Sequence, residues 1–373
     1  MNGARLRLST LAKIAAGLAL LGVALFASGV IPIGAAGGHT AVGRWVLHTA
    51  MLRSVAFHSI GAEVPDLSAP GLARLGAGHY ESGCAPCHGS PAAAPGGAAQ
   101  AMLPPPPELS GAAEDWSPAE LHGIVDQGVM MTGMPAWPAR HREDEVWAMV
   151  AFLQRLPDLD AAGYRALAYG GAEGPSRGLT LPSDPPVADC VRCHGPEGRG
   201  PDGEAASPGP IPRLDIQPRA ALEAALAGYA QEGRPSGPMR HAVAGLDAEA
   251  LARLAARFAE APTAPVPALD PAAVAPERLA RGRDIARRGL PEQDVAACEP
   301  CHAPGGGRMR EAFPRLAGQR AAYLEAQLAL YRADPPVGGG RFAEIMRRAA
   351  HPLSAQDAEA VAQWYASRRP DPR

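Results

Sequence analysis

The chain has 373 residues, a formal net charge of −3 and an aromatic content of only 5%. This length exceeds what one ordinary hydrophobic core organises and predicts two or three domains. The small net charge gives no global sign of nucleic-acid binding. Because large aromatic side chains are scarce and protein interiors are close-packed, we expect something other than side chains to fill part of the interior.

The N-terminus predicts a membrane anchor. Three basic side chains precede a run of 20 uncharged residues, 14–33. About 20 apolar residues span a bilayer, whereas the apolar part of a signal peptide usually holds about 7–15. The basic flank is expected to stay in the cytoplasm. Residues 1–38 are therefore expected to anchor the chain in a bacterial inner membrane, with the rest in the periplasm; a cleaved signal, with small residues at 34–36 for a peptidase, is the alternative.

The segment 39–64 is expected to be an amphipathic linker. Residues 40–60 are predicted to form a helix at the membrane interface, with Trp45 near the lipid headgroups. A spacer helix packed on the first domain is the alternative. The expected apolar side of this helix comprises Val42, Trp45, Val46, Thr49, Leu52 and Ala56.

All six cysteines belong to three copies of one motif, CxxCH. The first cysteines of successive copies are 106 and 108 residues apart. A period of about one domain's length indicates serial domains, because the repeats of solenoids run about 20–50 residues. The three copies are "CAPCH" from Cys84, "CVRCH" from Cys190 and "CEPCH" from Cys298.

The expected domains are 65–165, 166–265 and 266–373. The second and third are visibly related, because "IPRLDIQPRAALEAAL" in one parallels "FPRLAGQRAAYLEAQL" in the other. A stretch rich in proline and alanine, 261–277, reads as a semi-rigid linker between them.

Helical signals dominate the chain. Ser117 and Glu120 form a capping box around Pro118, and Gly128 is expected to end that helix. Later apolar residues recur at spacings of three and four after the candidate N-caps Asp247 and Ser354. Alternating patterns typical of strands are absent, so the predicted class is all-α.

Two cysteines three positions apart, followed at once by histidine, can form thioethers to both vinyl groups of a haem while the imidazole ligates the iron. A zinc site would need two CxxC pairs close together, and here they are more than 100 residues apart. A thioredoxin-like CxxC requires a βαβ framework, which the sequence lacks. We therefore expect three covalent haem c groups, attached through Cys84, Cys87, Cys190, Cys193, Cys298 and Cys301 and ligated by His88, His194 and His302.

A c-type haem with histidine on one face commonly takes methionine on the other. Met134, Met239 and Met346 follow the motif histidines by 46, 45 and 44 residues, and this near-constant spacing selects one methionine in each domain. The alternatives are that these are core methionines, or that His241 and His351 are the ligands. Met130 and Met131, close to Met134, are expected to pack beside the ring.

Other residues are candidates for the surroundings of the haems. The carbonyls of Pro212 and Pro314 are expected to orient the motif imidazoles. The stiff segment "LPPPPEL", 103–109, is expected to line one haem edge or to be a plain loop. Candidates for contacts with the haem propionates are Trp137, Arg213 and Arg315.

On these motifs the chain resembles a membrane-anchored trihaem cytochrome built from class I cytochrome c domains. The first domain, through "GHYESGCAPCHG" and "TGMPAWPARHREDEVWAMVAFLQRLP", is similar to single-domain electron carriers. The other two, through "PRL..Q", resemble the halves of periplasmic dihaem cytochromes. The resemblance implies an electron carrier, without catalytic residues, that links a quinol-oxidising complex to a terminal oxidase. It also allows a subunit of an alcohol, aldehyde or gluconate dehydrogenase, and a haem peroxidase or gas sensor would instead need an open iron.

Charge is distributed unevenly over the three domains, with net values of −7, −3 and +3 in chain order. Complementary charge raises association rates between weakly bound redox partners. We therefore expect the first and third domains to dock different partners, with Glu143, Asp144 and Glu145 on the acidic docking face of the first. The alternative is a solvated exterior without a docking role.

Overall fold

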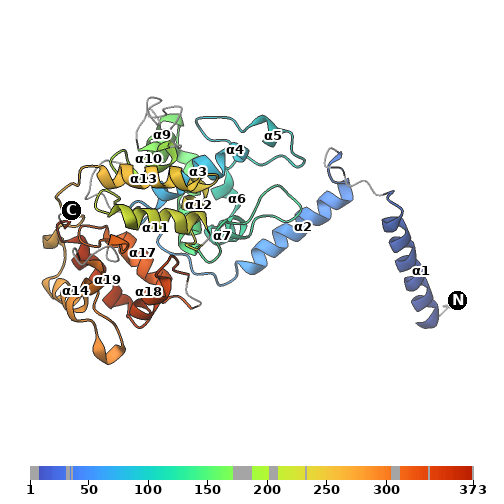
Figure 1. The fold of residues 1–373 in the computed structure, drawn as a ribbon. Helices are drawn as coiled ribbons and strands as arrows, with labels where there is room; N and C mark the ends of the chain where they lie inside the picture. The colour runs from blue at the N-terminus through green and yellow to red at the C-terminus, as the bar shows by residue number, and fades with distance from the viewer. Residues whose placement is uncertain are drawn as a thin grey trace.

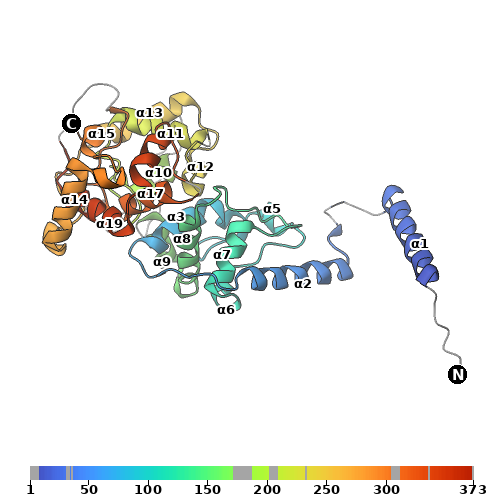
Figure 2. The same ribbon diagram turned by 90° about the horizontal axis from the view of Figure 1, so that it is seen from below.

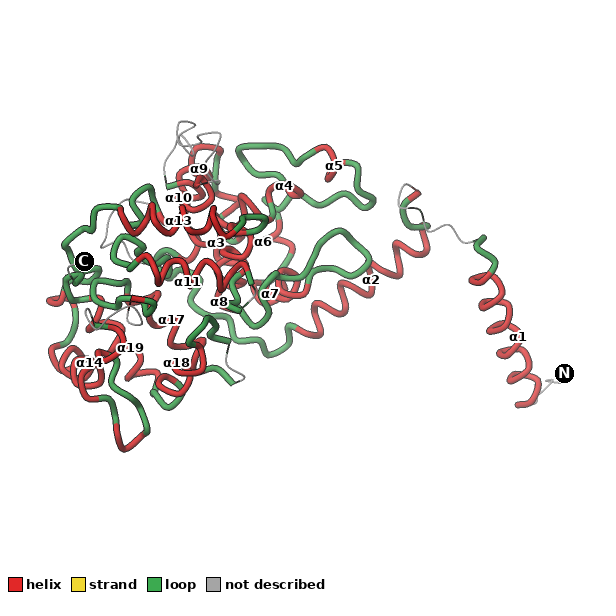
Figure 3. The backbone as a smooth tube through the Cα atoms, viewed as in Figure 1, coloured by secondary structure: helices red, strands yellow, loops and turns green. Residues whose placement is uncertain are grey.

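The computed structural model describes most of the chain as helices and loops. It contains no β-strand within the described residues, only two isolated β-bridges (Figure 3). The all-α prediction is confirmed. The described residues are 8–30, 34, 37–170, 187–200, 209–231, 233–303, 311–334 and 337–371.

The N-terminal part consists of two helices outside the main body (Figure 1). Helix α1 (Leu8–Ala27) contains a stretch, Ser9–Ala27, that is long and apolar enough to cross a membrane. Helix α2 (Ala41–His58) begins at Thr40, whose hydroxyl accepts a hydrogen bond from Gly43 N. The helix expected at 40–60 is therefore present.

Helix α2 packs against α7 (Pro118–Gln127) of the first domain. The side of α2 that makes this contact differs from the apolar side that carries Trp45. Its half-buried positions include Leu47, Met51 and Val55, which are spaced by four residues. The side that carries Trp45 faces outward, and Trp45 is 68% exposed. The alternative of a helix packed on the first domain is therefore confirmed, and contact of the outward apolar side with the membrane interface stays a prediction.

The main body has three hydrophobic clusters. We call the helices around them the first unit (α3 to α9, within 72–169), the second unit (α10 to α13, within 187–260) and the third unit (α14 to α19 with the preceding η3, within 271–366). The second unit makes contacts with both of the others (Figures 1 and 2).

The first unit is built on the crossing of α3 (Leu72–Gly83) over α8 (Glu143–Leu153). The helices approach so closely at Gly76 that a Cβ atom there would overlap the carbonyl oxygen of Ala148. The remaining elements are α4 (Ala85–His88), α5 (Gly97–Gln100), α6 (Ala112–Asp115), α7, η2 (Leu156–Asp158) and α9 (Ala161–Tyr169). Helix α9 runs across the division expected at residue 165, and its Tyr164 belongs to the first cluster.

The third unit repeats this crossing with α14 (Pro276–Arg288) and α19 (Ala355–Ala366). Gly282 stands in the place of Gly76, since a Cβ atom there would overlap the carbonyl oxygen of Ala360. Its other elements are η3 (Pro271–Ala273), η4 (Pro291–Gln293), α15 (Glu299–His302), α17 (Ala321–Arg332) and α18 (Ala343–Ala350).

The second unit has the smallest core. Its elements are α10 (Val187–His194), α11 (Arg219–Ala230), α12 (Gly237–Val243) and α13 (Ala248–Glu260). Only Leu222, Ala255 and Phe258 form its buried cluster in the described part of the chain. Its position between the other units therefore depends on contacts across two junctions.

The predicted helix boundaries are accurate where a cap was recognised. Ser117 and Glu120 form the complete capping box of α7, and Gly128, at φ 66°, ends that helix. Asp247 and Ser354 cap α13 and α19 through hydrogen bonds from backbone N–H groups. These ends are local in origin, because each side chain satisfies a backbone donor within three residues.

Candidate haem-binding sites

Each CxxCH motif forms a helical turn that ends at its histidine. In the first motif, His88 N donates to the carbonyl of Cys84, and in the third, His302 N donates to that of Cys298, at 2.9 and 3.0 Å. The second motif is the C-terminal end of α10. All six thiols are unbridged, and burial raises the pKa of Cys193 to about 11.

The three motif imidazoles are held in the same way. Nδ1 lies 2.7 Å from the carbonyl oxygen of Pro107 in His88, 3.2 Å from that of Pro212 in the second histidine and 2.7 Å from that of Pro314 in the third. A carbonyl only accepts, so Nδ1 carries the hydrogen, and in the neutral imidazole Nε2 then has the free lone pair. This is the tautomer that a metal bound at Nε2 requires.

The expected roles of Pro212 and Pro314 are therefore confirmed, and the matching role of Pro107 was missed. The sequence held a signal for it. Pro107 opens a "PEL" sequence that corresponds to the "PRL" sequences at Pro212 and Pro314. The proline follows its histidine by 19, 18 and 12 residues in the three units, so the first unit's spacing is close to that of the second.

A cavity of about 680 Å³ extends across the second and third units, and α3 and the start of α8 of the first unit form part of its wall. Burial lowers the pKa of His194 to about 4, so that imidazole is neutral as a metal ligand must be. The wall of the cavity includes Cys190, Cys193, His194 and Met239 from the second unit and Cys298, Cys301, His302 and Met346 from the third.

Both of these motif histidines, and both methionines expected from the spacing in the same two units, line this one cavity. His241, the rival to Met239, also lines the cavity, whereas His351 is exposed and is not part of its wall.

In the first unit, Met134 lies half-buried in a loop that folds back on the end of α7. Trp137 N donates to the carbonyl of Asp126 at 2.9 Å, and Met134 N donates to Thr132 Oγ1 at 3.1 Å. Met130 and Met131 are 86% and 64% exposed. They project from the surface of the protein, and their packing beside the haem ring stays a prediction.

The second and third units meet through two reciprocal pairs of hydrogen bonds. Gln319 accepts from Arg213 N at 2.8 Å and donates to the Arg213 carbonyl at 2.9 Å. Gln217 does the same with Arg315, at 2.9 Å in both directions. The repeated "PRL..Q" pattern thus joins each unit to the other through the same two residues.

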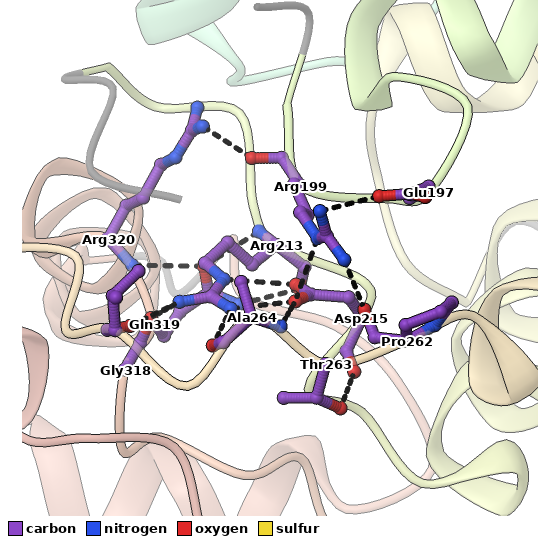
Figure 4. A network of polar contacts seen from close by, with 11 residues as sticks. Glu197, Arg199, Arg213, Asp215, Pro262, Thr263, Ala264, Gly318, Gln319 and Arg320 are labelled. Carbon is purple, nitrogen blue, oxygen red and sulfur yellow. Dashed lines mark hydrogen bonds and ion pairs between the residues drawn. The ribbon is translucent and has the colours of Figure 1, made fainter. Parts of the chain in front are cut away.

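Arg213 is fully buried in this junction (Figure 4). Its guanidinium holds both oxygens of Asp215 at 2.9 and 2.6 Å. It also donates to the carbonyls of Ala264, Val266 and Gly318. All five N–H donors are used within the protein, so the expectation that Arg213 contacts a propionate is wrong.

The same network fixes the start of the linker expected at 261–277. Thr263 Oγ1 donates to the carbonyl of Asp215 at 2.7 Å, and Ala264 N donates to its carboxylate at 3.0 Å. Arg199 reaches the carbonyl of Pro262 at 2.8 Å (Figure 4). This part of the linker is pinned to the second unit.

The first and second units meet around Glu145, which is only 4% exposed. Trp137 Nε1 donates to this carboxylate at 3.2 Å, so the indole N–H is occupied by protein and the expected propionate contact is wrong. Arg142 pairs with the same carboxylate at 2.8 Å. Glu145 is therefore buried where the first and second units meet, because it also binds Ser236 and Gly237 of the second unit. The expectation that Glu145 lies on an exposed acidic docking face is wrong.

Helix α3 of the first unit lies directly against the second CxxCH motif. Arg192, within that motif, donates to the carbonyl of Gly78 at 3.2 Å. A Cβ atom at Gly78 would lie 2.7 Å from Cys193 Sγ. The same helix ends at Cys84, so one helix joins two attachment motifs.

The residues present fit haem. Three motifs offer paired thiols and an imidazole with a free Nε2, and a largely apolar cavity adjoins two of them. Within the described residues, no group of three or more His, Cys, Asp or Glu side chains is arranged to hold a metal ion by itself.

Comparison with known proteins agrees with this reading. Residues 71–153 match the family model described as cytochrome c oxidase, cbb3-type, subunit III. A thiosulfate dehydrogenase electron acceptor from Thiomonas intermedia is 33% identical over 49% of this chain and 80% of its own length. Cytochrome c4 from Thiocapsa roseopersicina is 34% identical over 47% of this chain and 84% of its own length.

Among solved structures, reduced cytochrome c4 from Pseudomonas stutzeri matches 49% of this chain and 95% of its own, with a TM-score of 0.39 and 27% identity. The relatives of known sequence and the three attachment motifs lead to one conclusion: the chain belongs to the cytochrome c family, as an electron-transfer protein that carries three covalent haem c groups.

Proposed function

We propose that this protein is a membrane-anchored relay that passes single electrons along three haems in the order of the units. The observation that carries the proposal is the central place of the second motif. Cys193 lies against α3, which leads to the first motif, and shares one cavity with the third. A haem held there has a neighbour on each side.

The proposed ligand set is one histidine and one methionine for each iron. When bound, haem supplies a reversible one-electron couple, and the axial ligands set its potential. The protein's part is to hold each imidazole through a proline carbonyl, bring the methionine to the opposite face and exclude water. The pairs are His88 with Met134, His194 with Met239 and His302 with Met346.

The proposed electron donor is a periplasmic dehydrogenase, and the proposed acceptor is a terminal oxidase. Two relatives are named as electron acceptors of thiosulfate dehydrogenase. The first unit carries the match to an oxidase subunit. A quinol-oxidising complex remains the alternative donor. Contacts in such complexes are small and short-lived, which suits a carrier that must dissociate after each transfer.

The proposed location is the inner membrane, with the haem units in the periplasm. Helix α1 provides the span, and the outward side of α2 provides a second, interfacial contact. Deletion of residues 1–38 is expected to release a soluble haem protein. If the truncated protein still sediments with membranes, α2 or a protein partner holds it there.

The ligand set is tested by replacing each methionine in turn. Met134→Ala, Met239→Ala and Met346→Ala should each open one haem in three to carbon monoxide and remove about a third of the near-infrared band of sulfur-ligated ferric haem. Met130→Ala is the matched control and should change neither. Bis-histidine spectra throughout, or fewer than three haems per chain, would contradict the assignment.

The relay is tested by rapid reduction of the full-length protein with a thiosulfate dehydrogenase and thiosulfate. All three haems should become reduced. Gly78→Ala, which inserts a Cβ atom 2.7 Å from Cys193 Sγ, should slow exchange between the first and second haems only. Unchanged exchange in this variant would argue against transfer across this contact.

A further inference from the structure

The helix that carries Met239 is held at its N-terminus by the first unit. Ser236 is the N-cap of α12, and its hydroxyl accepts a hydrogen bond from Met239 N at 3.3 Å. That hydroxyl in turn donates to Glu145 Oε1 at 2.6 Å, and Gly237 N donates to Glu145 Oε2 at 2.7 Å. A carboxylate from one unit therefore fixes the first turn of a ligand-bearing helix in another.

Two further groups of the first unit hold the same turn. Arg142 donates to the carbonyl of Pro235 at 2.5 Å while pairing with Glu145. The Trp137 ring covers Gly237 so closely that a Cβ atom there would lie 2.8 Å from Cε2. In the opposite direction, Arg240 donates to the carbonyl of Pro138 at 3.2 Å.

The carboxylate is fully engaged by these contacts. Glu145 receives hydrogen bonds from Trp137, Ser236 and Gly237 and an ion pair from Arg142. A buried carboxylate is tolerated only with such partners. Four fixed donors leave little freedom for the carboxylate or for the backbone that it binds.

Among the described residues of the third unit, no carboxylate caps the corresponding helix. Met346 lies in α18, whose N-cap residue Phe342 makes no side-chain capping hydrogen bond. Both ligand-bearing turns are thus held by a neighbouring unit, the second unit's by a carboxylate and the third unit's by a backbone hydrogen bond from Gly340 N to the carbonyl of Gly233 at 2.7 Å.

We propose that Glu145 is a positioning residue for the second haem site: it holds the first turn of α12 so that Met239 meets the iron only when the first and second units are docked. The proposal rests on the proposed ligand set. Docking of the first unit would then shift the reduction potential of the second haem, because the axial ligand sets that potential.

The test uses the full-length holoprotein in detergent. Glu145→Gln keeps the size of the side chain but removes the charge that pairs with Arg142. Ser236→Ala removes one link without leaving a buried charge unpaired, and so keeps the test informative if the first variant folds poorly. Asp144→Asn is the matched control, since Asp144 pairs with Arg142 but is partly exposed and does not reach α12.

We expect Glu145→Gln and Ser236→Ala to weaken the near-infrared band by up to about a third and to admit carbon monoxide at one haem in three. The control should match the parent. If Met239→Ala removes its share of the band but neither variant changes it, Glu145 only holds the units together and the positioning role is overturned. If Met239→Ala itself leaves the band intact, the ligand set fails and the positioning role fails with it.

Discussion

The junction between the second and third units repeats itself, whereas the junction between the first and second does not. In the former, Gln217 and Gln319 make the same pair of hydrogen bonds in opposite directions. In the latter, Glu145 of the first unit binds the start of α12 in the second unit, and the bond in the opposite direction, from Arg240 to the carbonyl of Pro138, uses a different residue type. The second and third units are related and meet symmetrically through their shared "PRL..Q" pattern. The first and second units are dissimilar, so their junction uses residues, such as Glu145, that are not repeated in the other unit.

The two junctions also differ in their chemistry. At the repeated junction, the buried ion pair of Arg213 and Asp215 belongs to one unit and faces backbone carbonyls. At the other, the charged groups Arg142 and Glu145 reach directly into the neighbouring unit. Side chains bond to backbone groups at both junctions, but at the junction of the first and second units both members of a buried ion pair reach across, Arg142 to the carbonyl of Pro235 and Glu145 to Gly237 N.

The largest expected effect concerns the repeated junction. Arg213→Met should lower the free energy of unfolding by about 3–5 kcal/mol, because the Asp215 carboxylate stays buried but loses the guanidinium that binds both of its oxygens. Denaturant unfolding followed by far-ultraviolet circular dichroism measures the change. Adding Asp215→Leu should recover most of the loss. Arg219→Met, at an exposed ion pair, is the control, and a loss no larger than in that variant would contradict the role of Arg213.

The second prediction concerns the pH dependence of stability, which should arise at the junction between the first and second units. Burial, together with His241 and Arg192 nearby, lowers the pKa of His79 from 6.5 to about 4. Between these values the unfolded chain binds the proton more readily, so stability falls as pH drops from 6.5 towards 4. At pH 5 the loss is on the order of 2 kcal/mol.

This pH effect belongs to the first junction, where the His79 ring packs on Trp137 with ring centroids 4.7 Å apart. Unfolding of the full protein at several pH values measures it. His79→Gln should flatten the profile in this range, and His351→Gln in the third unit controls for loss of a histidine. An unchanged slope in His79→Gln would show that the acid sensitivity arises elsewhere.

The smallest expected effects concern the two glutamines. Gln319→Ala should cost about 2 kcal/mol and Gln217→Ala about 1 kcal/mol, because buried groups lose their hydrogen-bond partners. Gln319 should cost more, since it also accepts from Arg320 N at 3.0 Å. Denaturant midpoints of the holoproteins distinguish the two. Equal costs, or a larger cost for Gln217→Ala, would contradict the hydrogen-bond count.

The sequence by itself determined the local features of this protein. The all-α class, the caps at Ser117, Asp247 and Ser354, and the three attachment motifs depend on residues within a few positions of one another. The bonds from the motif imidazoles to Pro212 and Pro314 also followed from the repeat. Such features are readable because the interacting groups are neighbours in the chain or recur at a fixed spacing.

Only the tertiary structure decided how the units meet. Trp137 and Arg213 looked like haem contacts, yet their donors are taken by Glu145 and by Asp215 with three carbonyls. Glu145 looked like a surface charge and is buried against α12. The packing of the units determines which partner each of these residues binds. That partner is often about 100 residues away in the chain. A hydrogen bond carries no sequence spacing of its own, so these partners followed from the packing of the three units.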